Sequence, residues 1–338
     1  MLGHERPGTI YWIDHYLVNT NDSVRWEAFH ALVLGATAWP DPNGKAVKRG
    51  FFQDITRNGH GGRGTNHGGF VSPTPLPPTK GLGKGLPRYG FYIEAADIDY
   101  HLRRLEKAGA VHGDPARISH EGEAGTVIYW QDPDGNQYEF WAPDFLPPGA
   151  MTGCTPVRVG RISHGVFESR DLDRTAAFFA RYCFLEPYTG AGVAADTLVL
   201  PLAAGGRLVF KKVEELGERT TGCGLRDAHT ALIVRRDDFI PNLERVWAEL
   251  PEWDYDPSRS QTVEDAGALP ARTVLHISPS GRKFKEMTGR GDDWLDWDTN
   301  MFHFQGGSPL AGSMSDYENH PVEDYFEEWE RTHEREPA

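Results

Sequence analysis

Two histidines and one glutamate recur at matching places in the second half of this 338-residue chain. His164 and His229 each lie in a segment that reads as the first strand of a repeated unit, and Glu286 lies in the segment that reads as the last strand of the second such unit. Two imidazoles and one carboxylate on one side of an ion leave open positions opposite, as in non-haem Fe(II) oxygenases. We therefore predict that His164, His229 and Glu286 bind a divalent metal, Fe(II) or else Mn(II).

A repeated βαβββ unit has to position these residues. Its clearest copy covers residues 88–141, where a strand is followed by Asp97 as a helix N-cap and then by an apolar helical stripe of Ile98, Leu102 and Leu105. Short strands and an Asp-Pro-Asp-Gly turn complete the unit. One such unit cannot bury its own apolar faces, so several copies are expected to pack together.

Three further copies begin near residues 9, 160 and 227. Nearly the same number of residues separates His15 from Glu139 as separates His164 from Glu286, which indicates a duplicated half. The expected fold class is α+β, with four βαβββ modules in two tandem domains whose curved mixed sheets enclose a metal site. The predicted domains are residues 1–147, without a working metal site, residues 158–305, which bind the metal, and an acidic tail at 306–338.

Composition excludes several classes of partner. The formal net charge is −14, and phosphate backbones would meet a repelling surface, so we expect no nucleic-acid partner. No apolar run approaches the roughly 20 residues that span a bilayer, and the first residues lack the pattern of a signal peptide. Three cysteines are too few for a disulfide framework. We expect a cytoplasmic protein with no membrane partner.

The acidic tail contains an apolar stripe. Val322, Tyr325, Phe326 and Trp329 follow the i, i+3, i+4, i+7 spacing of an amphipathic helix. Such a helix should dock on the body of the protein or on a second subunit, and we expect a homo-oligomer.

The four modules, one of which closes with Asp-Pro-Asp-Gly-Asn-Gln-Tyr-Glu-Phe-Trp at 132–141, resemble the vicinal oxygen chelate superfamily. That superfamily includes glyoxalases, epimerases, antibiotic-resistance proteins and extradiol ring-cleaving dioxygenases. The resemblance covers about residues 8–305. Four modules with ligands in the second half look most like the type I extradiol dioxygenases. The resemblance implies an Fe(II)-dependent dioxygenase that cleaves an aromatic vicinal diol, catechol-like or heteroaromatic, with O₂.

The second half departs from the family pattern at one ligand. The turn at 278–281 reads Ser-Pro-Ser-Gly, and Glu286 follows it one residue later than usual, so that Lys285 occupies the usual place. A one-residue bulge would restore the facing of Glu286. The family also uses a His and a Tyr as acid and base, and the resemblance implies His276 and His303 as candidates here.

Three alternatives stay open. The ring-cleavage signature of the family also occurs in the first half, as His120, Tyr129 and Glu139, and a site there would include His15, although Gly90 stands where a second metal histidine is expected. Another enzyme of the superfamily, an isomerase or lyase, would use Zn²⁺, Mn²⁺ or Ni²⁺ without O₂. A protein that only binds a small aromatic ligand is the third alternative.

Overall fold

The structure is a computed structural model. It describes residues 10, 12–35, 37–38, 50–54, 66–71, 76, 81–120, 122–151, 154–203, 205–215, 229–234, 276–277 and 302–306. For some residues inside these strands only the backbone is described, and His15, His229, His276 and His303 are among them. The predicted tail helix, Lys285 and Glu286 lie outside the described residues.

From β1 to β12 the described elements follow the expected order of strand, helix and further strands, and in the fourth predicted module only strands are described. The first module contains β1 (Ile13–Thr20), α1 (Ser23–Leu34), β2 (Thr37–Ala38), β3 (Gly50–Asp54) and β4 (Asn66–Val71). The second contains β5 (Arg88–Tyr92), η1 (Ala95–Asp97), α2 (Ile98–Ala108), β6 (Val111–His112), β7 (Ala116–His120), β8 (Glu123–Gln131) and β9 (Gln137–Pro143). The third contains β10 (Ile162–Ser169), α3 (Leu172–Cys183), β11 (Thr197–Pro201) and β12 (Arg207–Lys212). The fourth contains β13 (His229–Val234), β14 (His276–Ile277) and β15 (Phe302–Gly306).

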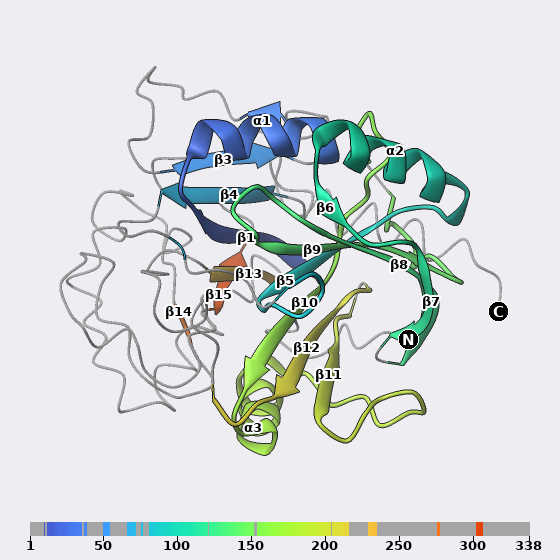
Figure 1. Ribbon diagram of the computed structural model, residues 1–338. Coiled ribbons are helices and arrows are strands. Elements are labelled where there is room, and N and C mark those ends of the chain that lie inside the picture. Colours follow the sequence, from blue (N-terminus) through green and yellow to red (C-terminus); the bar gives the residue numbers. More distant parts are fainter. Residues whose placement is uncertain are drawn as a thin grey trace, which may run out of the picture.

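Local signals in the sequence account for the helices. Asp171 is the N-cap of α3, because its carboxylate accepts a hydrogen bond of 2.9 Å from the backbone N–H of Arg174. Helix α2 ends at Gly109 in the left-handed conformation that glycine adopts without strain. Helices α1 and α2 lie side by side, and α3 lies at the opposite end of the molecule (Figure 1). None of the helices in the described ranges is long and apolar enough to cross a membrane.

The described strands form two mixed sheets. In the first, the strand order is β14-β15-β13-β1-β4-β3-β2, and we call it the β1–β13 sheet. In the second, the order is β11-β12-β10-β5-β9-β8-β6, with β7 paired to β8, and we call it the β5–β10 sheet. The α+β class and the mixed sheets are as predicted.

The way the modules pair differs from the prediction. Strand β10 of the third module pairs with β5 of the second, and β13 of the fourth pairs with β1 of the first. Each sheet therefore draws strands from both halves of the sequence, so the boundary between residues 147 and 158 does not separate the two sheets. The first strands of all modules present similar hydrogen-bonding edges. The sequence pattern within one module therefore does not indicate which first strands pair with each other.

The two sheets pack against each other through one apolar core. Tyr16 of β1 stacks on Tyr89 of β5, with ring centroids 3.9 Å apart and planes 12° apart. Phe91, Trp130 and Tyr138 continue this core on the β5–β10 sheet. Successive residues of a strand face opposite sides, so the residues next to these aromatics occupy the outer face of each sheet.

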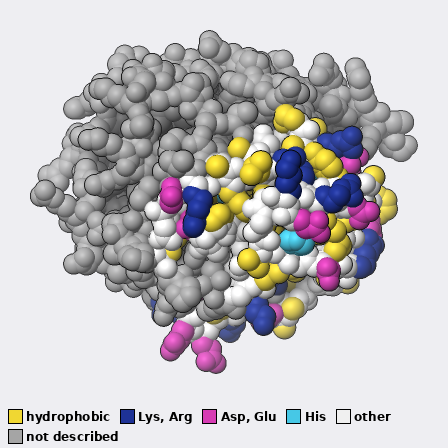
Figure 2. All heavy atoms as spheres, turned by 45° about the horizontal axis from the view of Figure 1, so that its top comes forward, with side chains coloured by type: hydrophobic (Ala, Val, Ile, Leu, Met, Phe, Trp, Pro, Cys, Tyr) yellow, Lys and Arg dark blue, Asp and Glu magenta, His cyan; other side chains and the backbone are white. Residues whose placement is uncertain are grey.

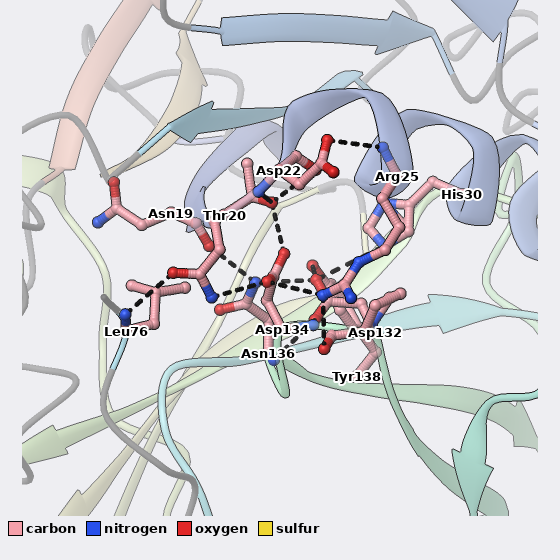
Figure 3. Close-up of polar contacts among 12 residues, drawn as sticks. Asn19, Thr20, Asp22, Arg25, His30, Leu76, Asp132, Asp134, Asn136 and Tyr138 are labelled. Carbon is pink, nitrogen blue, oxygen red and sulfur yellow. Dashed lines mark hydrogen bonds and ion pairs between the residues drawn. The ribbon is translucent and has the colours of Figure 1, made fainter. Parts of the chain in front are cut away.

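The turn at 132–135 joins the two sheets through polar contacts (Figure 3). The Asp134 carboxylate accepts hydrogen bonds from Thr20 Oγ1 and, at 2.9 Å, from Asn21 Nδ2. Asn136 Nδ2 donates to the backbone carbonyl of Asn19 over 3.0 Å. The Asp-Pro-Asp-Gly turn therefore holds the β8–β9 hairpin against the end of β1, where α1 begins.

Burial of Asp132 in this turn affects its titration. Its carboxylate accepts 2.9 Å hydrogen bonds from the backbone N–H groups of Asp134 and Asn136. Burial is nevertheless the largest influence, and it raises the pKa of Asp132 from 3.8 to about 6.

Figure 2 shows one face of the molecule. On the described part of that face, cationic and anionic side chains are interspersed among apolar ones. Arg117 and Asp144 form one of the exposed ion pairs of the described residues.

Candidate functional site

Hydrogen-bond register brings several histidine positions into one row across the β1–β13 sheet. His15 of β1 lies opposite Ala231 of β13, Ala231 lies beside His303 of β15, and His303 lies opposite His276 of β14. Partners in a ladder share a face of the sheet, so positions 15, 303 and 276 fall on the same face. That face is the one opposite Tyr16 and therefore opposite the core between the sheets.

His229 belongs to the same face. It lies opposite Leu17, two residues along the ladder from the pair of His15 and Ala231. Diagonal neighbours of this kind have α-carbons about 7–8 Å apart, with β-carbons somewhat closer. Positions 15 and 229 thus stand on adjacent antiparallel strands at a separation suited to two ligands of one ion.

The same row continues to the other edge of the sheet with oxygen-bearing residues. Asn66 of β4 lies beside His15, and Asp54 of β3 lies opposite Asn66. Strands are about 4.8 Å apart, which places position 54 about two strand spacings from position 15. Neutral imidazole is a good ligand for iron, zinc and nickel, and a carboxylate offsets part of the ion's charge. This set of donor residues fits a divalent transition metal.

The β5–β10 sheet has an equivalent row with different chemistry. Gly90 of β5 lies opposite His164 of β10 and beside Glu139 of β9. Arg207 of β12 lies beside His164, and Tyr129 of β8 lies opposite Glu139. The register of β10 on β5 repeats that of β1 on β13, including the bulge, so His164 is at the place that His15 occupies in the other sheet and Glu139 is at the place of His303.

A buried network of charged groups fills the centre of this second row. His164 Nε2 is 2.7 Å from Glu139 Oε1, and Arg88 Nε donates to the same oxygen over 2.8 Å. His164 Nδ1 lies 2.9 Å from Ser163 Oγ. The side chains of His164 and Glu139 are fully buried, and that of Arg88 is 7% exposed.

This network does not fit a metal ion. Gly90 supplies no ligand, and the imidazole of His164 occupies the space beside it, since a Cβ built at Gly90 would lie 2.3 Å from His164 Cε1. The guanidinium of Arg88 already provides the positive charge that Glu139 requires. Among the residues whose side chains are described, no group of three histidines, cysteines or acids could hold a metal.

The sequence-predicted ligands are therefore not brought together as expected. His164 lies in the β5–β10 sheet and His229 in the β1–β13 sheet, because their modules do not pair with each other. The strand parallel to β13 is β15, and Glu286 lies in the stretch between β14 and β15 that is outside the described residues. The alternative site in the first half is not brought together in one sheet either, since His15 and Glu139 are in different sheets. The predicted acid–base candidates, His276 and His303, do lie as ladder partners in the sheet of His229.

Sequence reasoning missed two residues. His15 was assigned to an incomplete site in the first half, although its place in the first strand of its module matches that of His164. Arg88 was not considered, and a cation two residues before Gly90 on a buried strand is the signal that could have revealed the ion pair with Glu139.

Solved structures of other proteins share the fold of this chain. A proposed dioxygenase from Bacillus subtilis aligns with a TM-score of 0.62 and 16% sequence identity over 96% of this chain and 96% of its own. Glyoxalase I from Zea mays aligns with a TM-score of 0.54 and 12% identity over 95% and 96%. This chain has the vicinal oxygen chelate fold, as predicted.

Comparison of sequences adds no closer relative. No protein-family model matches the sequence. No curated protein matches it either.

Proposed function

We propose that this protein is an Fe(II)-dependent dioxygenase that cleaves the ring of an aromatic vicinal diol, with its site on the outer face of the β1–β13 sheet. The observation that carries the proposal is the position of His15 and His229 on one face of two adjacent antiparallel strands. Structural similarity to the Bacillus subtilis protein over nearly the whole of both chains supports the same reaction class.

The ligand set is His15, His229 and one carboxylate. Glu286 remains the proposed carboxylate, because it follows β14, which is part of this sheet. His164 is assigned instead to the buried ion pair with Glu139. A bound metal supplies Lewis acidity and holds a substrate with two adjacent oxygens next to O₂.

We assign proton transfer to the remaining histidines of the row, His303 and His276. His303 is two strands from His15, and His276 is one strand farther. Imidazole titrates near neutral pH, so a histidine here can accept a phenolic proton from the diol and return it later. The product would be an open-chain semialdehyde acid. We propose a homo-oligomer in the cytoplasm as the working form.

Anaerobic metal analysis of the purified protein, followed by O₂ uptake with a panel of catechols, tests this function. About one iron per chain, O₂ uptake and a yellow semialdehyde absorbance are expected. Loss of both metal and uptake in His15→Ala and in His229→Ala would place the site.

Two other results would change the assignment. Bound zinc, manganese or nickel with no O₂ uptake would indicate an isomerase or lyase. No metal in the wild-type protein would leave a ligand-binding protein.

A further inference from the structure

The residue that follows each proposed histidine ligand in the sequence faces the other sheet. Both of these residues contact the same side chain there. Tyr16 follows His15 and Thr230 follows His229, and these two residues lie opposite each other in the β1–β13 ladder. Both are fully buried, on the face that packs against the β5–β10 sheet. The pair thus stands on the inner face at the point where the outer face carries positions 15 and 229.

Tyr89 of β5 contacts both members of that pair. Its ring stacks on Tyr16 at a centroid distance of 3.9 Å, and its hydroxyl lies 2.9 Å from Thr230 Oγ1. The ring also packs edge-on against Phe167 of β10 at 6.1 Å. Burial raises the pKa of Tyr89, so its hydroxyl remains protonated and available for the bond to Thr230.

We propose that Tyr89 is a positioning residue that sets the relative placement of His15 and His229. It acts across the sheet interface, through the stack on Tyr16 and the hydrogen bond to Thr230. The proposal rests on the proposed function, because it needs His15 and His229 to be ligands. The physical reason is that the backbone of a β-strand is shared by both faces, so fixing Tyr16 and Thr230 on the inner face fixes the neighbouring residues on the outer one.

Partners outside the ligand shell of a metal site commonly change metal affinity when they are removed. Tyr89 contacts the inner face of the strands, so it should act through the separation and orientation of the two histidines. It should not alter the donor atoms themselves. The expected signature is weaker binding with the same number of ligands, together with rescue by a variant that restores the hydrogen bond.

The experiment is Co²⁺ titration of the full-length apoprotein, followed by visible absorption, with thermal unfolding measured in parallel. Tyr89→Phe and Thr230→Val each remove the same hydrogen bond and keep nearly the same shape. Each should weaken Co²⁺ binding about 10-fold. The double variant should be no weaker than either single variant, because only one bond is lost. Thr230→Ser, which keeps a hydroxyl, should restore most of the affinity.

Tyr92→Phe is the matched control. Tyr92 is a buried tyrosine of the same strand that belongs to a different apolar cluster, on the other face of the sheet. Its substitution should leave Co²⁺ affinity unchanged, whatever it does to the unfolding temperature.

The outcomes separate the two proposals. If His15→Ala and His229→Ala abolish Co²⁺ binding while Tyr89→Phe and Thr230→Val bind as the wild type does, the positioning role is wrong and the proposed site stands. The same conclusion follows if Tyr92→Phe weakens binding as much as Tyr89→Phe. If the wild type binds no Co²⁺, or if the two alanine variants still bind it, both proposals are wrong.

Discussion

The two sheets of this protein share one architecture and differ in the chemistry of one row of residues. In the β1–β13 sheet the row contains His15 and His303. In the β5–β10 sheet the equivalent places hold His164 and Glu139, and Arg88 forms an ion pair with Glu139. The comparison teaches that equivalent places in two similar sheets can carry different donor residues, and that one sheet fills its centre with an ion pair of its own.

The internal cation explains why a carboxylate is tolerated at the centre of the β5–β10 sheet. Glu139 is fully buried, and an isolated buried carboxylate would be costly. Arg88 and His164 both contact its Oε1 atom. This sheet therefore needs no metal to balance the charge of its central carboxylate, whereas the proposed site of the other sheet would use histidines as donors to an external cation.

The largest expected effect is on metal binding, which should depend on one sheet only. His15→Ala removes a proposed ligand and should weaken metal binding by more than about 100-fold. His164→Ala removes the equivalent histidine of the β5–β10 sheet and should leave the metal content unchanged. Metal analysis after dialysis measures both. Loss of metal from His164→Ala with retention in His15→Ala would reverse the assignment of the two sheets.

The next effect is on stability and should come from the β5–β10 sheet. Arg88→Ala removes the guanidinium that pairs with the buried Glu139 carboxylate and should lower the free energy of unfolding by about 3–5 kcal/mol. Urea unfolding measures it. The double variant Arg88→Leu/Glu139→Leu removes both charges and should recover much of the loss. A double variant less stable than Arg88→Ala would argue that the ion pair itself stabilises the fold.

A smaller effect tests how closely His164 fills the place beside Gly90. Gly90→Ala should destabilise the protein by about 1–3 kcal/mol, because the new methyl group would meet His164 Cε1 at 2.3 Å. Gly113→Ala is the control, since a Cβ there has its nearest contact at 3.4 Å from Leu82. Equal unfolding temperatures for the two variants would show that the place beside Gly90 is not tightly filled.

The smallest expected effect concerns the turn between the sheets. The pKa of Asp132 is raised from 3.8 to about 6 in the folded protein, so the folded state binds more protons than the unfolded state between these pH values. The stability contributed by this carboxyl is fully present below about pH 4 and is lost as pH rises through about 6, by on the order of 2 kcal/mol.

Urea unfolding of the wild type and Asp132→Asn across pH 4–7 checks this. The variant should be less stable, because an amide cannot accept every hydrogen bond that the carboxylate accepts. Its deficit should narrow as pH rises, since only the wild type loses the contribution. A deficit that stays constant with pH would contradict the raised pKa.

Much of the fold was predictable because its signals are local. The apolar stripe that includes Leu105 predicted α2, and the Asp-Pro-Asp-Gly residues at 132–135 predicted the turn between β8 and β9. Each of these depends on neighbours within a few residues, which a single sequence displays directly.

The site was predictable only in part. The repeats singled out the histidines of first strands, His164 and His229, as candidate ligands, and the family resemblance suggested His276 and His303. The pairing of His229 with His15 was not predicted, because the two are brought together by a ladder between the first and last modules. His164 was expected beside His229 and lies instead against Glu139.

The sequence by itself determined the α+β class, elements such as helix α2 and the turn at 132–135, and which residues of a strand share a face, since all of these follow from periodicity and local turn chemistry. Only the tertiary structure decided which first strands pair. Each first strand offers an equivalent edge of N–H and C=O groups, so backbone hydrogen bonding does not discriminate among partners. The choice depends on side-chain packing between distant segments, such as the stack of Tyr16 on Tyr89 and the bond from Tyr89 to Thr230.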